Sequence, residues 1–296
     1  MVGTRESKIV KTIAVISLLI IGIMCALPFL IIVSASFSKE SELIKYGYSL
    51  FPRGTSLEAY KMLLAAPGGL LKAYGVTLFT TITGTTLSIV FTTMMAYALS
   101  RKAFKWRNII SFYMFFTMLF NGGAVASYIV IADFLNLRDN LLVLIIPGCV
   151  SAWNVILIRT FMAKDLGSYI EAAKIDGASE YKILMTIVTP MVKTGITVIV
   201  LKTILTYWGE WYNCLMYMPK EEYITLQYYL QKILSSVQSI QDAAKNGQYI
   251  STAGEMIPRE TVRMAICVIA TAPMLIALTP FQKYFIRGIN LGGVKG

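Results

Sequence analysis

Six long apolar runs constrain the fold of this chain more than any other feature. Each approaches the roughly 20 residues that an α-helix needs to cross a hydrocarbon core about 30 Å thick. The runs are Ile13–Val33, Val76–Leu99, Ile109–Ala132, Leu141–Phe161, Met191–Tyr207 and Val262–Phe281. They are apolar on all sides, whereas the strands of a transmembrane barrel alternate apolar and polar residues. The sequence, with 56% hydrophobic residues, therefore predicts an all-α integral membrane protein with six transmembrane helices.

The basic residues predict how these helices are oriented. If the N-terminus is cytoplasmic, the segments on that side carry 14 basic residues against five acidic ones. Cytoplasmic loops of membrane proteins carry such an excess of Lys and Arg. We expect a cytoplasmic N-terminus (1–12), a transmembrane domain (13–287) with a cytoplasmic loop inside it (162–190), and a cytoplasmic C-terminal tail (288–296). The net charge of +11 then lies beside lipid headgroups and does not indicate nucleic-acid binding.

Several classes of catalytic and metal site lack their usual residues here. The chain has no histidine, and its four cysteines have no metal-ligand spacing. No P-loop of the form GxxxxGK[ST] occurs, so work driven by ATP must use a nucleotide site on another chain. The sequence predicts a membrane subunit with no catalytic site, no metal site and no bound cofactor. The basic N-terminus resembles a secretory signal, but the apolar run that follows is longer than a typical signal core and predicts an uncleaved first helix.

A polar segment between the fourth and fifth runs predicts a helix-turn-helix. Ser168 and Glu171 stand three residues apart, as in a capping box, which predicts a short helix beginning at Tyr169. Gly177 can adopt a positive φ, end that helix and lead the chain into a second one. Ala172 and the alanine after it would give the surface a shallow face that a partner can approach closely. The plainer interpretation is an ordinary capped cytoplasmic loop.

The same segment resembles a known motif. Glu171-Ala172-Ala173, followed by Gly177 six residues after the glutamate and later by Ile187 and Pro190, is similar to the EAA loop of permease subunits in bacterial ABC importers. Thr189 stands where that loop usually carries a second aliphatic residue before the proline. This departure is mild and leaves the resemblance in place.

Two further segments narrow the resemblance. The tail Gly288–Gly296 is similar to the C-terminal tail of the smaller, six-helix permease of maltose-type importers. A central region resembles the branch that handles complex oligosaccharides, including importers of alginate and pectin fragments. The residues that carry this likeness are Asn121-Gly122-Gly123, Asn136-Leu137, Ile146-Pro147-Gly148 and Asn154 to Phe161. The resemblance runs from about Leu78 to the C-terminus.

The resemblance implies a type I ABC importer permease fold in the bacterial cytoplasmic membrane, with several partners. These are a second homologous permease, two cytoplasmic ABC ATPases that use ATP and Mg, an extracellular solute-binding protein, and membrane lipid. The helix-turn-helix would be the coupling helix that docks on an ATPase, with the contact residues Glu171, Ala172, Ala173, Asp176, Gly177 and Ala178. The tail would lie along the interface of the ATPase pair through Gly292, Gly293, Val294, Lys295 and Gly296. Glycine-rich ends are otherwise usually frayed.

The implied substrate is an oligosaccharide, whose path should contain amides, carboxylates and aromatic rings. Candidates at the outer end of the fifth run are Trp208, Glu210, Trp211 and Asn213. Their rings fit an aromatic belt at the membrane interface at least as well. Candidates within the membrane are Asn121, Trp153 and Asn154. Helix packing is the commonest alternative for these three, and Asn121 with its two following glycines is also expected to break the third helix.

Lys202 is the most unusual single residue. It lies 11 residues from the start of the fifth run, which places it about 16 Å deep, near the middle of the bilayer. An ionised lysine at that depth is costly unless it faces water or a negative partner, and Glu210 is too far along the helix to be one. The hypothesis is that Lys202 faces the translocation path and favours sugars that carry carboxylates, such as uronic-acid oligosaccharides. Snorkelling, or an ion pair with the partner permease, is the alternative.

The external segments and the function class leave further possibilities open. Residues 34–74 and 208–261 are long polar stretches; by resemblance the second would reach the solute-binding protein, with a surface helix over residues 225–234. An importer of an amino acid or ion that shares the EAA loop is one alternative function. A membrane-embedded enzyme or scaffold is another, which the missing catalytic clusters argue against.

Overall fold

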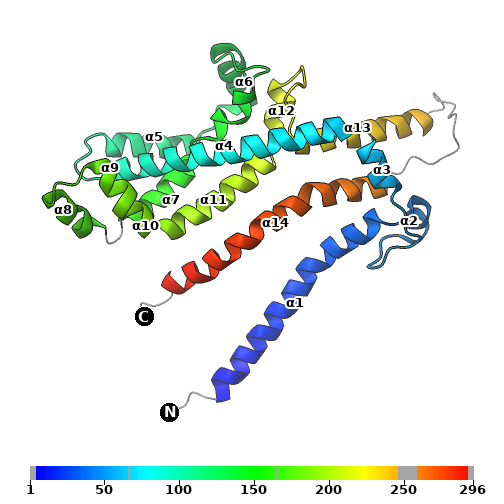
Figure 1. The fold of residues 1–296 in the computed structure, drawn as a ribbon, viewed down its shortest axis with the longest axis horizontal. Coiled ribbons are helices and arrows are strands. Elements are labelled where there is room, and N and C mark those ends of the chain that lie inside the picture. The colour runs from blue at the N-terminus through cyan, green and yellow to red at the C-terminus, as the bar shows by residue number, and fades with distance from the viewer. Residues whose placement is uncertain (1–4, 66, 164–165, 246–258, 293–296) are drawn as a thin grey trace. The chain divides into compact units, whose positions relative to one another are not determined.

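The computed structural model describes residues 5–65, 67–163, 166–245 and 259–292. The regular elements in these ranges are helices, with one isolated β-bridge between Ser38 and Thr55 (Figure 1). The prediction of an all-α chain is confirmed. The chain divides into two compact units, one made of residues 1–68 and 230–273 and the other of residues 69–229 and 274–296.

The first unit contains α1 (Arg5–Ser36), α2 (Glu40–Tyr46), α3 (Glu58–Leu64) and the beginning of α14 (Glu260–Gly292). The side chains of α1 are exposed from Val10 to Leu30, as expected for a helix whose neighbours are lipid or another chain. The end of α1 is held by the Ser36 hydroxyl, which lies 2.9 Å from that of Tyr60 in α3.

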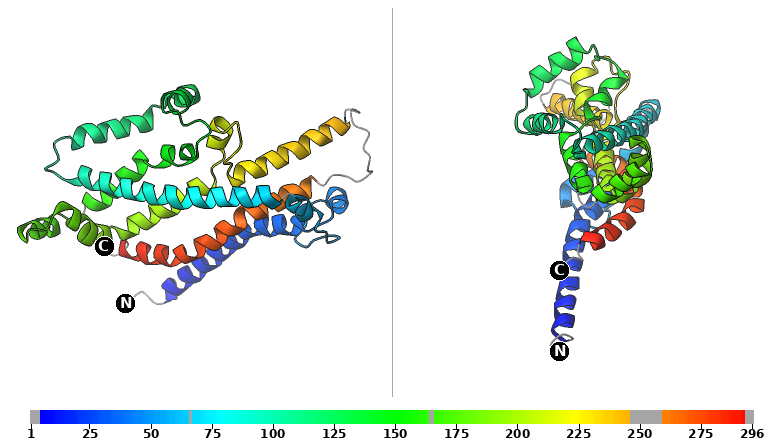
Figure 2. Two further views of the ribbon diagram at one scale, coloured as in Figure 1. Left: turned by 45° about the horizontal axis from the view of Figure 1, so that its top comes forward. Right: turned by 90° about the vertical axis from the view of Figure 1, so that its left-hand side faces the viewer.

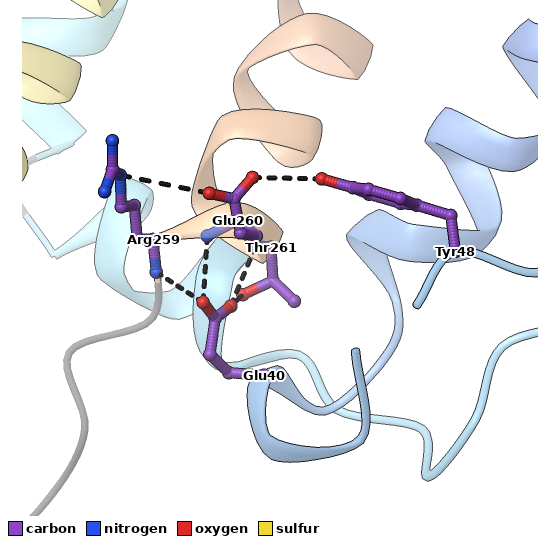
Figure 3. Close-up of polar contacts among 5 residues, drawn as sticks. All are labelled: Glu40, Tyr48, Arg259, Glu260 and Thr261. Atoms are coloured by element: carbon purple, nitrogen blue, oxygen red, sulfur yellow. Dashed lines mark hydrogen bonds and ion pairs between the residues drawn. The ribbon is translucent and has the colours of Figure 1, made fainter. Parts of the chain in front are cut away.

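A carboxylate binds the first turn of α14 (Figure 3). Glu40 of α2 is only 9% exposed. Its oxygens accept hydrogen bonds from the backbone N–H groups of Arg259, Glu260 and Thr261 at 2.9 to 3.1 Å, and from the Thr261 hydroxyl at 2.7 Å. The free N–H groups at a helix N-terminus carry partial positive charge, so a carboxylate satisfies both their hydrogen bonding and their charge. We call this contact the Glu40 clasp.

The second unit is built on α4 (Pro67–Ser100), α5 (Arg107–Leu119), α7 (Ala152–Ala163) and α11 (Lys193–Trp208). Helix α7 packs against both α5 and α11 (Figures 1 and 2). One buried apolar cluster joins these helices to each other and to the segment that follows α7. Its members include Leu99, Met114, Val155, Ile158, Ile183 and Ile199.

The third apolar run is divided. The predicted helix over residues 109–132 is found as α5, a break at Phe120–Gly122, then α6 (Gly123–Tyr128) and the π-helix η1 (Ile129–Phe134). The side-chain oxygen of Asn121 accepts a hydrogen bond from the Gly123 N–H at 2.9 Å, and Gly123 has a φ of 82°. The expected helix break at Asn121 and its two glycines is thus confirmed.

The fourth and fifth runs are bent. The 3₁₀ turns η2 (Leu141–Leu144) and η3 (Ile146–Gly148) precede α7 with a 41° bend. Before α11 the chain forms α9 (Glu180–Ile183), the π-helix η4 (Leu184–Val188) and α10 (Thr189–Met191), with a bend of 83°. The Thr189 hydroxyl donates to the Leu184 carbonyl at 2.8 Å. The residue that departs from the EAA pattern therefore satisfies a carbonyl at the start of the π-helix.

Three helices are long and apolar enough to cross a membrane: Val10–Ser36 of α1, Gly68–Ser100 of α4 and Glu260–Thr279 of α14. The number among the described residues rises to at most five if each bent pair is counted as one span. The predicted first and second helices lie within α1 and α4, and the sixth begins in α14. The total of six transmembrane helices stays a prediction.

Tyr207 of α11 fixes the packing of α4 against the bent segment. Its hydroxyl donates to the Ile145 carbonyl at 2.8 Å. A Cβ atom at Gly148 would lie 2.8 Å from the Tyr207 hydroxyl oxygen, and a Cβ at Gly84 of α4 would overlap the Tyr207 ring. The two glycines therefore admit the ring where no other residue would, and α4, η3 and α11 meet at one buried side chain.

The described part of the segment after α11 contains two further helices. It forms α12 (Tyr212–Tyr217), which packs on η2, and α13 (Leu226–Lys245). The surface helix expected over residues 225–234 is confirmed as a helix, and it continues for 11 residues beyond the predicted end.

Candidate functional site

The predicted helix-turn-helix is present, but its beginning differs from the prediction. Helix α8 runs from Gly167 to Ile175, with Leu166 before it and no side-chain cap, so the predicted capping box of Ser168 and Glu171 is wrong. Leu166 is 2% exposed and Ile170, one turn later, is 4% exposed, and both belong to the core cluster of the unit. Burial of these two residues on one helical face, rather than a serine cap, determines where the helix begins.

The turn between the two helices follows the prediction closely. Gly177 has a φ of 73°. The Ala178 N–H bonds the Ala173 carbonyl at 2.9 Å and the Gly177 N–H bonds the Lys174 carbonyl at 3.0 Å, which together form a Schellman motif. The Ser179 hydroxyl then accepts from the Lys182 N–H at 3.3 Å and caps α9. The sequence reasoning missed that cap, although a serine directly after the turn is a recognisable signal for it. We call residues 167–183 the knuckle.

The knuckle exposes apolar side chains in a polar segment. Ile175 is 87% exposed, Tyr181 68% and Tyr169 56%, and Glu171, Ala172 and Asp176 are also exposed. Exposed apolar groups gathered on a segment of fixed shape are typical of a protein interaction site. Two of the predicted contact residues turn inward: Ala173 is 8% exposed and belongs to the core cluster, and the half-buried Ala178 packs against it. The shallow outer face is therefore formed by Ala172 without Ala173.

Three of the predicted substrate-path residues lie together. The Lys202 ammonium group of α11 lies 3.2 Å from the side-chain oxygen of Asn154 and 3.9 Å from the centroid of the Trp153 ring, both in α7. Asn154 is 4% exposed, whereas Trp153 is 43% exposed and Lys202 is also exposed. Lys202 has no partner within α11 in the sequence pattern, and its partners come from α7 instead. An exposed ammonium group, an exposed aromatic ring and a buried amide thus lie together, and we call them the Lys202 cluster.

The candidates at the C-terminal end of α11 have different surroundings. Trp208 is 8% exposed and packs edge-on against Tyr74 of α4, with 6.4 Å between ring centroids. Glu210 accepts a hydrogen bond from the Asn213 N–H at 2.7 Å, and burial raises the pKa of its carboxyl group. Trp211 is 46% exposed. The side-chain oxygen of Asn121 accepts a hydrogen bond within its own loop, and within the described residues Asn121 is not part of the Lys202 cluster.

The predicted tail contacts lie almost wholly outside the described residues. Gly292 is the last residue of α14, and Gly293, Val294, Lys295 and Gly296 follow the described range. The described residues contain no group of three or more His, Cys, Asp or Glu side chains placed to hold a metal ion.

A carboxylate that the sequence reasoning missed joins the knuckle to α4. Glu180, the first residue of α9, lies 2.5 Å from the Lys174 ammonium group of α8 and 3.9 Å from the Arg101 guanidinium group, and it accepts a hydrogen bond from the Tyr97 hydroxyl. The Arg101 guanidinium also lies over the Tyr97 ring, 5.6 Å from its centroid. These partners stand up to 83 residues apart in sequence, so no local pattern predicts the contact. We call these four residues the Glu180 hub.

Comparison with known proteins gives consistent relatives, although no family model matches the chain. The chain is 33% identical over 296 residues to Protein LplC of Bacillus subtilis (strain 168), covering 99% of this chain and 97% of the relative. It is 33% identical over 280 residues to the polygalacturonan/rhamnogalacturonan transport system permease protein YtcP of the same organism, covering 94% and 96%. A crystal structure of a bacterial ABC transporter involved in the import of the acidic polysaccharide alginate contains a chain that matches with a TM-score of 0.78 and 27% identity, over 96% of this chain and 99% of that one.

Proposed function

This chain belongs to the permease subunits of carbohydrate ABC importers, and on that premise we propose that it carries an acidic oligosaccharide into the cytoplasm and is driven through its knuckle. Sugar transport by a membrane permease is the function of the family.

The knuckle is proposed to be the docking site for a cytoplasmic ABC ATPase. Its shape supports this role, because the Schellman turn at Gly177 and the Ser179 cap hold two short helices in a fixed arrangement. Glu171, Ala172 and Asp176 offer exposed contacts, whereas Ala173 anchors the helix from below. Gly177 and Ala178 form the turn itself. Nucleotide-driven movement of the ATPase would displace the knuckle and tilt the helices attached to it, provided that the ATPase contacts differ between the two states.

The other subunits supply what this chain lacks. Two ATPase subunits would bind ATP and Mg, and a second homologous permease would complete the translocation path. With both termini in the cytoplasm, the knuckle and the tail (292–296) face the ATPases, and the segment around α13 faces an extracellular solute-binding protein. On this proposal the chain is a multi-pass subunit of the bacterial cytoplasmic membrane. It has six transmembrane helices and no ATPase site of its own.

The Lys202 cluster is the observation that carries the proposed substrate class. An ammonium group attracts a carboxylate, an aromatic face stacks on a sugar ring, and an amide can bond hydroxyl groups. Lys202 and Trp153 expose the first two groups, and the side-chain oxygen of the buried Asn154 holds the ammonium group at 3.2 Å. A uronic-acid oligosaccharide offers a carboxylate and a ring face that match the two exposed groups. The names of two similar proteins, which refer to polygalacturonan/rhamnogalacturonan and to alginate, agree with this chemistry.

Uptake of charged and neutral sugars by the reconstituted complex tests the substrate class. Lys202→Met should lower uptake of a trigalacturonate about tenfold, since a hydrogen bond to a charged group contributes about 1.5–3 kcal/mol. If the wild-type complex also transports neutral maltotriose, uptake of that sugar should change much less. Lys202→Arg, which keeps the charge, is the matched control. Equal losses for the two sugars would mean that Lys202 serves packing or pairs with the second permease, and would overturn the charge-selection proposal.

Co-purification of the ATPase subunits tests the driving contact. Glu171→Lys or Gly177→Pro should remove the ATPases from the purified complex, because the first reverses a surface charge and the second cannot adopt the φ of 73° that the turn requires. Lys182→Gln, an exposed change in the same knuckle, should retain them. Deletion of Leu291 to Gly296 should impair transport or its coupling to ATP hydrolysis while membrane insertion stays intact. Full co-purification with both knuckle variants would contradict the docking role.

A further inference from the structure

The Glu180 hub joins three elements at one carboxylate. Lys174 comes from α8 and Glu180 from α9, so the carboxylate links the two arms of the knuckle across its turn. Tyr97 lies in the last turn of α4, which ends at Ser100, and Arg101 is the next residue. The inner end of a long membrane helix is therefore attached to the knuckle by side chains that are far from it in sequence.

The hub is anchored firmly on α4 and loosely on the knuckle. Tyr97 is 7% exposed and belongs to the core cluster, so its hydroxyl is held in place by packing. The side chains of Glu180 and Lys174 are 53% and 42% exposed, whereas that of Arg101 is 20% exposed. Charge-assisted hydrogen bonds are directional, unlike apolar packing, so the hub fixes the orientation of the knuckle on α4. One carboxylate shared between two cations also leaves positive charge that can pair with another anion.

A contiguous route of contacts leads from the hub to the Lys202 cluster within the second unit. Helix α4 carries Tyr97 near one end and Gly84 about 20 Å along its axis, at 1.5 Å per residue. The ring of Tyr207 fills the space left by Gly84. Tyr207 lies in α11, five residues after Lys202. A shift of α4 would meet Tyr207 directly, because buried side chains in close contact transmit displacement.

We propose that Glu180 is a positioning residue that transmits movement of the knuckle to α4, and through Tyr207 to the helix that carries Lys202. The hub makes the knuckle and the inner end of α4 move together. This inference rests on the proposed docking of an ATPase at the knuckle, and it assigns the transmission of that force to four named side chains. Spatial continuity alone does not demonstrate coupling, so the test measures the coupling itself.

The first test is a double-mutant cycle on the complete complex in proteoliposomes, with both permeases, the ATPases and the binding protein present. Glu180→Gln and Tyr97→Phe should each lower the amount of trigalacturonate transported per ATP hydrolysed about fivefold. The double variant should be no worse than the more impaired of the two single variants, since the effects of coupled residues are not additive. ATPase co-purification should stay unchanged. Lys174→Arg should keep the wild-type ratio, and Lys182→Gln is the matched control. Additive losses, or loss of the ATPases from the complex, would overturn the positioning role.

The second test needs no knowledge of the substrate. In a variant without the native cysteines, spin labels at Met94 of α4 and Lys182 of α9, which are both exposed, report the distance between α4 and the knuckle. This distance should remain the same with and without ATP in the wild-type complex, and its distribution should broaden in Glu180→Gln. An unchanged distribution in that variant would overturn the proposal. Failure of the wild-type complex to import trigalacturonate would count against the proposed substrate, and the label distances would still decide the role of the hub.

Discussion

Two glutamates connect distant segments of this protein in opposite ways. Glu40 is 9% exposed and accepts three backbone N–H groups and one hydroxyl group at the start of α14 (Figure 3). The side chain of Glu180 is 53% exposed, and its partners are the side chains of Tyr97, Arg101 and Lys174. Both carboxylates hold a helix end, but only Glu40 is bonded mainly to backbone.

The difference indicates which contact contributes more to stability. Backbone N–H groups at a helix N-terminus cannot turn away, so releasing Glu40 would leave the two buried donors of Thr261 and the half-buried N–H groups of Arg259 and Glu260 without this acceptor. Lysine and arginine side chains can rotate to water or to another anion at little cost. The Glu40 clasp is therefore the stronger attachment, whereas the Glu180 hub contributes little to the free energy of unfolding and acts by orienting the knuckle on α4.

The largest stability effect is expected at the stronger attachment. Glu40→Ala should destabilise the protein by about 3 kcal/mol, since each buried donor without a partner costs about 1–3 kcal/mol. Glu180→Ala should cost no more than about 1 kcal/mol, as is usual for exposed ion pairs. Glu58→Ala, at an exposed glutamate that begins α3, is the control. Thermal unfolding of the purified complex would measure all three, and equal destabilisation by the first two would break the distinction.

The next effect is expected at the buried contact between α4 and α11. Gly84→Ala should cost about 2 kcal/mol, because the added Cβ overlaps the Tyr207 ring and overpacking a core costs about 1–3 kcal/mol. Gly75→Ala in the same helix meets no atom within 4 Å and should be neutral or slightly stabilising. Unfolding measurements on the pair check this, and similar results for both would show that the ring does not fix the helix spacing.

A smaller effect is expected at the turn of the knuckle. Gly177→Ala should cost about 1 kcal/mol, the usual penalty for a non-glycine residue at positive φ, and it should weaken ATPase co-purification. Gly167→Ala, at the open first position of α8, should do neither. If Gly177→Ala reduced stability and left co-purification intact, the shape of the turn would not matter for docking.

The smallest effect is expected at the cap of α9. Ser179→Ala removes the acceptor for the Lys182 N–H and should cost about 0.5–1 kcal/mol. Hydrogen exchange at the Lys182 amide should become faster, while exchange in the core of α4 stays the same. Faster exchange in both places would mean that the knuckle and α4 unfold as one cooperative unit, which contacts beyond the four residues of the hub would then have to hold together.

The sequence predicted the features that depend on neighbouring residues. Gly177 ends α8 with a positive φ, and Asn121 breaks the third apolar run, because short-range backbone geometry determines both. The start of α8 was missed, since burial of Leu166 and Ile170 outweighs the serine that the capping box would use. The assignment of Ala173 to the outer face was wrong for a related reason, because tertiary packing buries it in the core cluster.

Contacts between distant residues could not be predicted in this way. Glu180 and Tyr97 are 83 residues apart, and Glu40 and Thr261 are 221 residues apart. Lys202, Trp153 and Asn154 were each identified as substrate-path candidates, but no periodicity within one helix shows that α7 and α11 bring them together. Chemistry that is unusual for its location can be recognised from sequence, whereas its partners depend on tertiary packing.

The most direct test of the central claim is ATP-dependent uptake of trigalacturonate by the complete importer in proteoliposomes, compared between wild type and Gly177→Pro. We expect ATP-dependent uptake by the wild-type complex, and loss of both the uptake and the bound ATPases in the variant. Uptake that continues in the variant with its ATPases bound would contradict the claim that the knuckle drives transport.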